Sequence, residues 1–119
     1  MKKILLMDDD KKIRSIYRMA LDMEGFDVVE VADWESATIA LLQHQDTDLT
    51  LLDINMPCMS GDIVYDVIRL YNPKIRVVMF SVCPIDEQKR LVRHADGYFD
   101  KADGVDTLIR KVRSALELS

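Results

Sequence analysis

The segment that most constrains the fold is LTLLDINMP at residues 49–57. It begins as an apolar run without helical spacing, stops at the carboxylate of Asp53, and soon reaches Met56-Pro57, which cannot continue a strand or begin a helix smoothly. A short apolar run that ends in this way is typical of a buried strand. We therefore expect a strand over residues 49–53 that delivers Asp53 to one edge of a sheet.

A second run has the same form at the start of the chain. Residues 3–7 are mainly apolar and lead directly into Asp8, Asp9 and Asp10. In an open α/β sheet, the functional crevice lies beyond the carboxyl ends of the parallel strands. If these two strands are neighbours, Asp8, Asp9 and Asp53 converge at that edge.

Apolar runs and amphipathic segments alternate along the rest of the chain. Further strands are expected at residues 26–31, 75–80 and 97–99, and helices around residues 13–21, 37–42, 63–71, 85–92 and 105–116. Asp10 and Asp33 are suited to cap the first two helices, and the fourth helix is the weakest element. Because parallel strands need crossover helices, this alternation predicts an α/β fold with helices on both faces of a parallel sheet.

Composition limits the classes of function. The 119 residues fit one domain, and the net charge of −5, from 21 acidic and 16 basic residues, argues against direct nucleic-acid binding by this domain. No apolar run approaches the roughly 20 residues of a membrane span, and the N-terminus does not have the form of a signal peptide. We therefore expect a cytoplasmic location and no membrane contact.

The predicted strands end in a series of reactive side chains. Asp8 and Asp9 follow the first strand, Asp53 ends the third, Ser81 follows the fourth and Lys101 follows the fifth. Clustered carboxylates repel one another unless a cation joins them, and Mg²⁺ characteristically binds carboxylates together with waters and phosphate oxygens. With a hydroxyl and an ammonium group added, the set suits a phosphoryl group.

These positions resemble the receiver domain of two-component response regulators. The resemblance lies in Asp8-Asp9, in Asp53 within LLDINMPCMSG, in Ser81 and in Lys101 after GYFD, and it covers residues 1–119 as a single receiver domain. It implies a doubly wound (βα)₅, flavodoxin-like fold with a sheet of order 2-1-3-4-5. It also implies a signalling domain that assists its own phosphorylation and dephosphorylation but is not an enzyme acting on a metabolite.

The resemblance assigns a role in phosphoryl transfer to each matching position. Asp53 would be the phosphoacceptor and would take a phosphoryl group from a sensor histidine kinase or phosphotransfer protein. The Mg²⁺ cofactor would be held by Asp9 directly, by Asp8 mainly through a water, by Asp53, and by the backbone carbonyl of Asn55. Lys101 would neutralise the phosphoryl oxygens.

The resemblance also suggests how phosphorylation changes the protein's surface. Ser81 would turn inward to hydrogen-bond the phosphoryl group, and Tyr98 matches an aromatic whose rotamer reports the activated state. The surface of the fourth helix, fifth strand and fifth helix would then control an output. In this family that surface commonly carries dimerisation or effector binding, and a homodimer through it stays an open expectation here.

Two other functions remain as alternatives, and departures from the family pattern support the first of them. Ala102 follows Lys101 where the family generally has proline, and Val82 follows Ser81 where a small residue is usual. One alternative is therefore a degenerate receiver that acts as a phosphorylation-independent interaction module. The other is a phosphohydrolase with Asp53 as nucleophile, although such enzymes carry a second acid two residues later, where this chain has Asn55.

Overall fold

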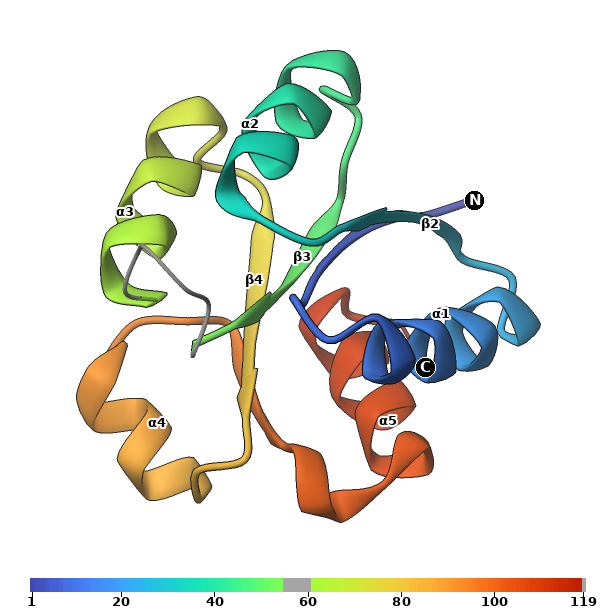
Figure 1. The fold of residues 1–119 in the computed structure, drawn as a ribbon, viewed down its shortest axis with the longest axis vertical. Coiled ribbons are helices and arrows are strands. Elements are labelled where there is room, and N and C mark those ends of the chain that lie inside the picture. The colour runs from blue at the N-terminus through green and yellow to red at the C-terminus, as the bar shows by residue number, and fades with distance from the viewer. Residues whose placement is uncertain (55–60, 119) are drawn as a thin grey trace.

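Five strands alternate with five α-helices in the computed structural model, which describes residues 1–54 and 61–118 (Figure 1). The strands are β1 (Lys3–Met7), β2 (Asp27–Val31), β3 (Leu49–Asp53), β4 (Arg76–Ser81) and β5 (Gly97–Asp100). The helices are α1 (Lys11–Met23), α2 (Trp34–Gln43), α3 (Gly61–Tyr71), α4 (Ile85–Leu91) and α5 (Val105–Ala115). A short 3-10 turn, Lys101–Asp103, joins β5 to α5.

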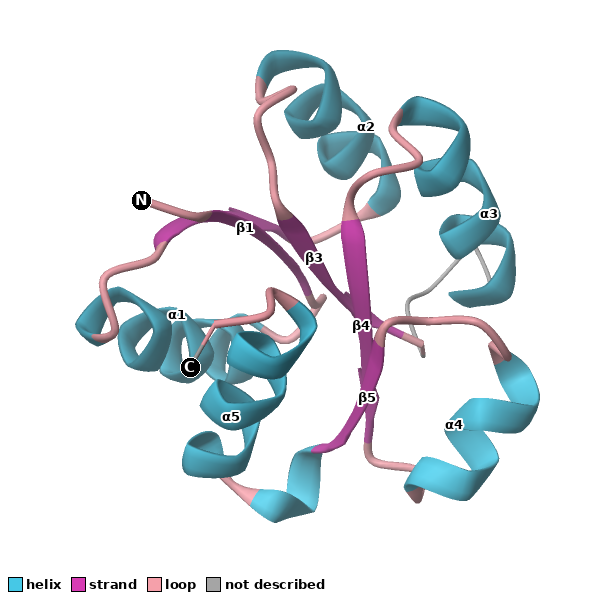
Figure 2. Cartoon of the chain, turned by 180° about the vertical axis from the view of Figure 1, so that it is seen from behind, coloured by secondary structure: helices cyan, strands magenta, loops and turns pink. Residues whose placement is uncertain are grey.

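All five strands pair in parallel, in the order β2-β1-β3-β4-β5. This order confirms the predicted doubly wound fold. Helices α1 and α5 cover one face of the sheet, and α2, α3 and α4 cover the other (Figures 1 and 2). The strand β3 therefore lies at the centre of the sheet, with its carboxyl end between those of β1 and β4.

The sheet carries a core on each face. Leu5 and Met7 of β1 join the cluster under α2 and α3, whereas Ile4 and Leu6 join the cluster under α1 and α5. Successive side chains of a strand point to opposite faces, so a strand covered on both faces is apolar at nearly every position, and Thr50 of β3 is a buried polar exception. This requirement explains the nearly uninterrupted apolar runs in the sequence.

Polar side chains begin the first two helices, as the sequence predicts. The carboxylate of Asp10 accepts hydrogen bonds from the backbone N–H groups of Lys12 and Ile13, and that of Asp33 accepts one from Ser36 at 2.7 Å. Each bond satisfies a backbone donor that the helix itself leaves unpaired. Within the described ranges, none of the helices has the length and apolar character that crossing a bilayer needs.

The structure differs from the sequence prediction at two places, the end of α4 and the segment after β5. Helix α4 ends at Leu91, because Val92 has an extended backbone and buries its side chain, whereas the apolar spacing predicts a helix that includes Val92. The turn after β5 was not predicted at all, and it begins where Asp100 accepts a hydrogen bond from the backbone of Ala102 at 2.9 Å. Apolar spacing does not reveal local polar bonds of this kind.

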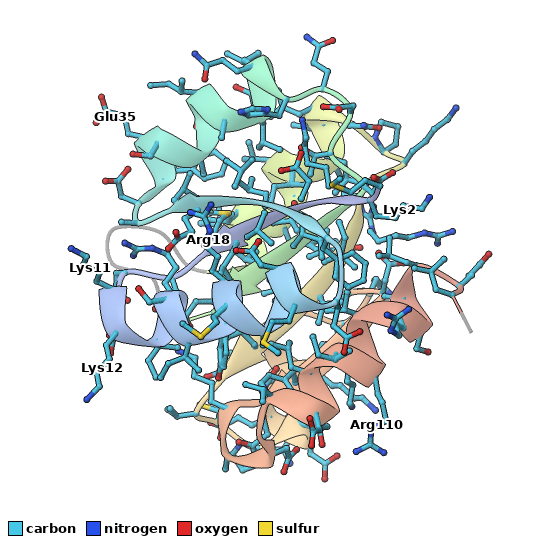
Figure 3. The ribbon with its side chains drawn as sticks, turned by 90° about the vertical axis from the view of Figure 1, so that its right-hand side faces the viewer. Lys2, Lys11, Lys12, Arg18, Glu35 and Arg110 are labelled. Carbon is cyan, nitrogen blue, oxygen red and sulfur yellow. The ribbon has the colours of Figure 1, made fainter. Side chains whose placement is uncertain are left out.

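Glu30 on β2 joins that strand to α1 through two arginines. Arg14 Nε donates to Glu30 Oε1 at 3.2 Å, and Arg18 Nη1 donates to Glu30 Oε2 at 2.6 Å. Figure 3 shows Arg18 reaching from α1 toward this strand. The hydrogen bond from Arg18 is the main cause that lowers the pKa of Glu30 below its ordinary value, and Arg14 adds to it.

Packing in the core lets us predict how a cavity at the centre of the sheet changes the free energy of unfolding. Leu51→Ala removes a fully buried side chain from β3, and we expect it to lower the free energy of unfolding by about 2–5 kcal/mol. The matched control Leu70→Ala changes a side chain that is 84% exposed and should stay within about 0.5 kcal/mol. Urea unfolding measures both, and equal losses would contradict the assigned core.

The link through Glu30 predicts a pH-dependent contribution to stability. Because the folded-state pKa of Glu30 is lowered, its stabilising contribution is present above its ordinary pKa of 4.5 and is lost as the pH falls through the folded value. Glu30→Gln should therefore lower the free energy of unfolding by about 1 kcal/mol near pH 7, and this deficit should shrink as the pH falls below 4.5.

Urea unfolding of wild type and variant across this pH range measures the effect. Glu35→Gln, at an exposed position on α2 (Figure 3), is the control and should show little change at any pH. A deficit for Glu30→Gln that stays constant with pH would contradict the ionic link.

Candidate functional site

The register of the sheet brings the ends of four strands to one edge. Met7 pairs with Leu52, so the next residue along each strand places Asp8 level with Asp53. Asp53 in turn pairs with Phe80, the residue before Ser81. On the far side of β4, Ser81 pairs with Asp100, the residue before Lys101. Strand pairing alone therefore brings Asp8, Asp53, Ser81 and Lys101 to one edge of the sheet.

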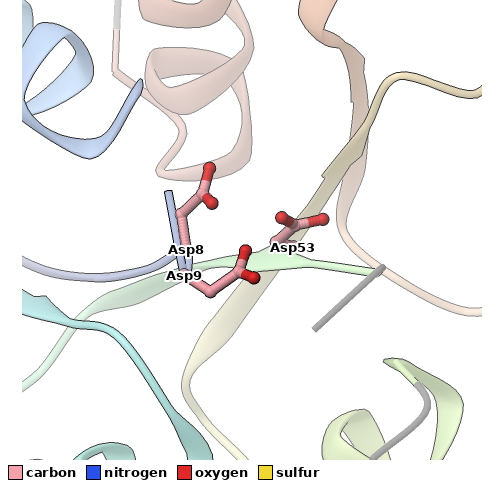
Figure 4. A group of neighbouring side chains, drawn as sticks. All are labelled: Asp8, Asp9 and Asp53. Atoms are coloured by element: carbon pink, nitrogen blue, oxygen red, sulfur yellow. The ribbon is translucent and has the colours of Figure 1, made fainter. Parts of the chain in front are cut away.

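Three carboxylates form a compact acidic group at this edge. Asp8, Asp9 and Asp53 each offer one oxygen atom, and these oxygens all lie within 4.8 Å of one another (Figure 4). Asp8 is fully buried and Asp53 is 3% exposed, whereas Asp9 is open to solvent. Negative charges this close repel strongly at low solvent exposure, so the group favours a bound cation.

Lys101 supplies a cation from the protein itself. Its Nζ donates to Asp8 Oδ2 at 3.1 Å and to Asp53 Oδ2 at 3.2 Å, and it lies 4.9 Å from the centre of the Phe80 ring. Burial of the ammonium group tends to lower the pKa of Lys101, but the charges of Asp53 and Asp8 outweigh burial and raise the pKa overall. The lysine therefore stays charged between the two carboxylates.

Asp8 is held by further contacts on both its side chain and its backbone. The backbone N–H of Asp10 donates to Asp8 Oδ1 at 2.9 Å, and Arg14 Nη1 donates to the backbone oxygen of Asp8 at 2.6 Å. Arg14 is itself oriented by Glu30. The start of α1 and the strand β2 thus fix the position of Asp8 before any ligand binds.

Ser81 and Tyr98, the two predicted switch residues, lie in different surroundings. Ser81 is fully buried, and its Oγ accepts a hydrogen bond from the backbone N–H of Cys83 at 3.1 Å. The ring of Tyr98 is mostly buried, its hydroxyl donates to the carbonyl of Val92, and that hydroxyl accepts from the N–H of Ala95 at 3.2 Å. Ser81 therefore belongs to the acidic edge, whereas the Tyr98 hydroxyl is bound to the segment after α4.

The donor set fits a hard divalent cation. Carboxylate oxygens are the ligands that Mg²⁺ prefers, and one lysine compensates only part of the charge of three carboxylates. Asn55, whose backbone carbonyl was predicted as a further ligand, lies outside the described residues.

Among the described residues no peptide bond is cis, so the Lys101–Ala102 bond is trans. Val82 is 73% exposed and takes no part in the core.

Two side chains that the sequence did not single out support this edge. Arg14 binds the backbone of Asp8, and Gln88 of α4 donates to the carbonyl of Phe99 on β5 at 2.8 Å. Arg14 looks like an ordinary charged residue on an exposed helix face. Gln88 carried a usable signal, because it occupies a buried position three residues after Ile85, where an amphipathic helix normally has an apolar residue.

Comparison with known proteins agrees with this geometry. The family model for the response regulator receiver domain matches residues 4–113. The transcriptional regulatory protein CpxR of Klebsiella pneumoniae is 34% identical over all of this chain and 51% of its own length. The response regulator GacA of Pseudomonas aeruginosa is 33% identical over 93% of this chain and 53% of its own. The chain thus spans about half the length of these relatives.

Solved structures of similar proteins have the same fold. A CheY-like response regulator receiver domain from Methanospirillum hungatei superposes with a TM-score of 0.86 at 25% identity, covering 98% of this chain and 94% of that one. The response regulator TrrA of Thermotoga maritima, solved in complex with Mg²⁺ and beryllium fluoride, gives a TM-score of 0.86 at 29% identity and covers 97% and 99%. The chain belongs to the response regulator receiver domain family of two-component systems.

Proposed function

We propose that Asp53 accepts a phosphoryl group from the phosphohistidine of a sensor histidine kinase or phosphotransfer protein, in a reaction that requires Mg²⁺. The observation that carries this proposal is the contact of the Lys101 ammonium with both Asp8 and Asp53 beside a third carboxylate. A phosphoryl group brings negative charge, and this edge holds a fixed cation and a donor set for a second one.

Among the three carboxylates, Asp53 is best placed to be the nucleophile. Both oxygens of Asp8 already accept hydrogen bonds, one from the backbone of Asp10 and one from Lys101. Asp9 is exposed and lies on the loop after β1, where nothing in the described structure holds its carboxylate against Lys101. Asp53 ends the central strand with a nearly buried carboxylate that contacts Lys101, so it combines a fixed position with a neighbouring positive charge.

The transfer is a displacement at phosphorus. An oxygen of Asp53 forms the new bond to phosphorus, the bond between phosphorus and the histidine nitrogen breaks, and the electron pair stays on the leaving imidazole. Asp8, Asp9 and Asp53, with the carbonyl of Asn55, would hold Mg²⁺, which supplies neutralisation of charge on the transferring group. Lys101 would keep contact with a phosphoryl oxygen, and Ser81 would donate its hydroxyl to another.

The proposed output is a change in the surface formed by α4, β5 and α5. Two segments that carry candidate residues adjoin this surface, because Ser81 ends β4 at the loop that leads to α4, and Lys101 follows β5. A new charged group bound by both residues would favour a different position of the loop between β4 and α4. A homodimer or an effector bound there, and a cytoplasmic location, stay predictions.

The first test is covalent labelling by a small phosphodonor. Wild type incubated with acetyl phosphate and Mg²⁺ should gain the mass of one phosphoryl group, and chelation of the metal should prevent the gain. Asp53→Asn should gain nothing, because an amide is not a competent nucleophile here. The matched control Asp66→Asn, at an exposed position on α3, should be labelled like wild type.

Intact-mass spectrometry measures each sample. Labelling of Asp53→Asn to the wild-type extent would overturn the assignment of the nucleophile. If wild type gains nothing from acetyl phosphate or from a phosphorylated histidine kinase, the phosphorylation-independent interaction module replaces this proposal.

A second test concerns the metal alone. Mg²⁺ at tenfold its dissociation constant should stabilise the folded protein by about 1.4 kcal/mol, visible as a rise in melting temperature relative to a chelator. Asp9→Asn removes one ligand and should abolish most of the rise, whereas Asp66→Asn should keep it. An equal rise for Asp9→Asn and wild type, measured by calorimetry at matched ionic strength, would contradict a Mg²⁺ site at this edge.

A further inference from the structure

Helix α4 is attached to the sheet through a buried glutamine. Of the residues in α4, all of which the structure describes, Gln88 alone is buried, and it is fully so. Its Nε2 donates to the carbonyl of Cys83 at 2.9 Å and to the carbonyl of Phe99 at 2.8 Å. Both amide hydrogens are therefore used, and the reversed orientation would place an oxygen against two carbonyl oxygens.

The two carbonyls lie on segments that lead to the acidic edge. Cys83 is the residue whose N–H donates to Ser81 Oγ, so its peptide groups connect Gln88 to Ser81 through two consecutive hydrogen bonds. Phe99 lies on β5, two residues before Lys101. Gln88 thus links α4 both to the loop after Ser81 and to the strand that carries Lys101.

The other side chains of α4 itself constrain its position less, although the Tyr98 hydroxyl also binds the carbonyl of Val92 directly after the helix. Ile85 packs on the core but is only partly buried, Leu91 is half exposed, and Lys89 Nζ lies 5.8 Å from the centre of the Tyr98 ring. Figure 2 shows the helix beside β5 at the margin of the sheet. Apolar contact tolerates sliding, whereas hydrogen bonds depend on distance and angle, so the bonds of Gln88 define a discrete position for α4.

The bonding of Gln88 is also incomplete. Its Oε1 is buried and has no hydrogen-bond partner among the described residues. A buried acceptor without a partner opposes the inward position, because the same oxygen would be hydrated if the side chain moved out. Two favourable hydrogen bonds from Gln88 therefore hold α4, and the burial of its Oε1 opposes them. Loss of the bond to the carbonyl of Cys83 or of Phe99 can then release the helix.

We propose that Gln88 is the positioning residue through which phosphorylation of Asp53 releases α4. This inference rests on the proposed function. When the hydroxyl of Ser81 turns to a phosphoryl oxygen, the N–H of Cys83 loses its acceptor and the loop rearranges. The carbonyl of Cys83 then withdraws from Gln88, and α4 leaves its position beside β5.

The test uses beryllium fluoride with Mg²⁺ as a phosphoryl analogue and compares two glutamine variants. Gln88→Met keeps the length of the side chain but removes both donors, and Gln43→Met changes an exposed glutamine on α2. The coupling between two sites is reciprocal. If binding of the analogue at Asp53 breaks the hydrogen bonds of Gln88, then removal of these bonds must increase the affinity for the analogue. The dissociation constant of the analogue should fall roughly fivefold in Gln88→Met and stay unchanged in Gln43→Met.

A merely structural role for Gln88 gives a different result. In that case Gln88→Met would have a lower melting temperature but would not bind the analogue more tightly. An unchanged or weaker affinity for the analogue therefore overturns the proposal. Amide hydrogen exchange adds a second criterion, because α4 in unliganded Gln88→Met should already exchange as fast as in liganded wild type.

A measurement on wild type keeps the proposal testable if Gln88→Met fails to fold. The side-chain amide hydrogens of Gln88, followed by NMR, should lose protection from exchange when the analogue binds, and retained protection overturns the proposal. Labelling of wild type by acetyl phosphate separates the two claims. If Asp53 is labelled but Gln88 does not respond, only the coupling is wrong, whereas absence of labelling overturns both.

Discussion

The ammonium group of Lys101 between Asp8 and Asp53 is the interaction on which the functional edge depends. It joins the carboxyl ends of β1, β3 and β5, which are far apart in the sequence and meet only through the order of the parallel sheet. Without it, the negative charges of two nearly buried carboxylates would face each other with much less compensation, which is costly in a protein interior. With it, the edge still carries excess negative charge that a divalent cation can balance.

The molecule combines a firmly fixed carboxylate edge with a less firmly held helix. Asp8 is bound through its side chain and its backbone, and β3 is covered on both faces. Helix α4, by contrast, has a glutamine as its one buried side chain, and its apolar Ile85 is only partly buried. Fixed geometry favours phosphoryl transfer, because catalysis of this reaction is mainly positioning and electrostatics. A helix attached by polar bonds can respond to the product of that transfer.

Much of the fold follows from the sequence, and so does the location of the candidate edge. Strands covered on both faces are almost entirely apolar, and the ends of neighbouring parallel strands lie at one edge, so Asp8, Asp53, Ser81 and Lys101 could be placed together from the sequence. The contacts of Arg14 and Gln88 could not, because side-chain hydrogen bonds to backbone carbonyls leave no mark in the apolar pattern, and the bond from Gln88 to Phe99 also joins α4 to β5. The end of α4 was also missed, since Val92 fits the apolar spacing of a helix but has an extended backbone.

The central claim is that Asp53, rather than its acidic neighbours, takes the phosphoryl group. The most direct measurement treats the phosphorylated protein with borohydride, which reduces an acyl phosphate to an alcohol, and then locates the change by peptide mass spectrometry. Our account predicts that homoserine replaces aspartate at position 53 alone, and only in samples that received both Mg²⁺ and phosphodonor. Reduction at Asp8 or Asp9, or a borohydride-resistant phosphate on Ser81, would contradict it.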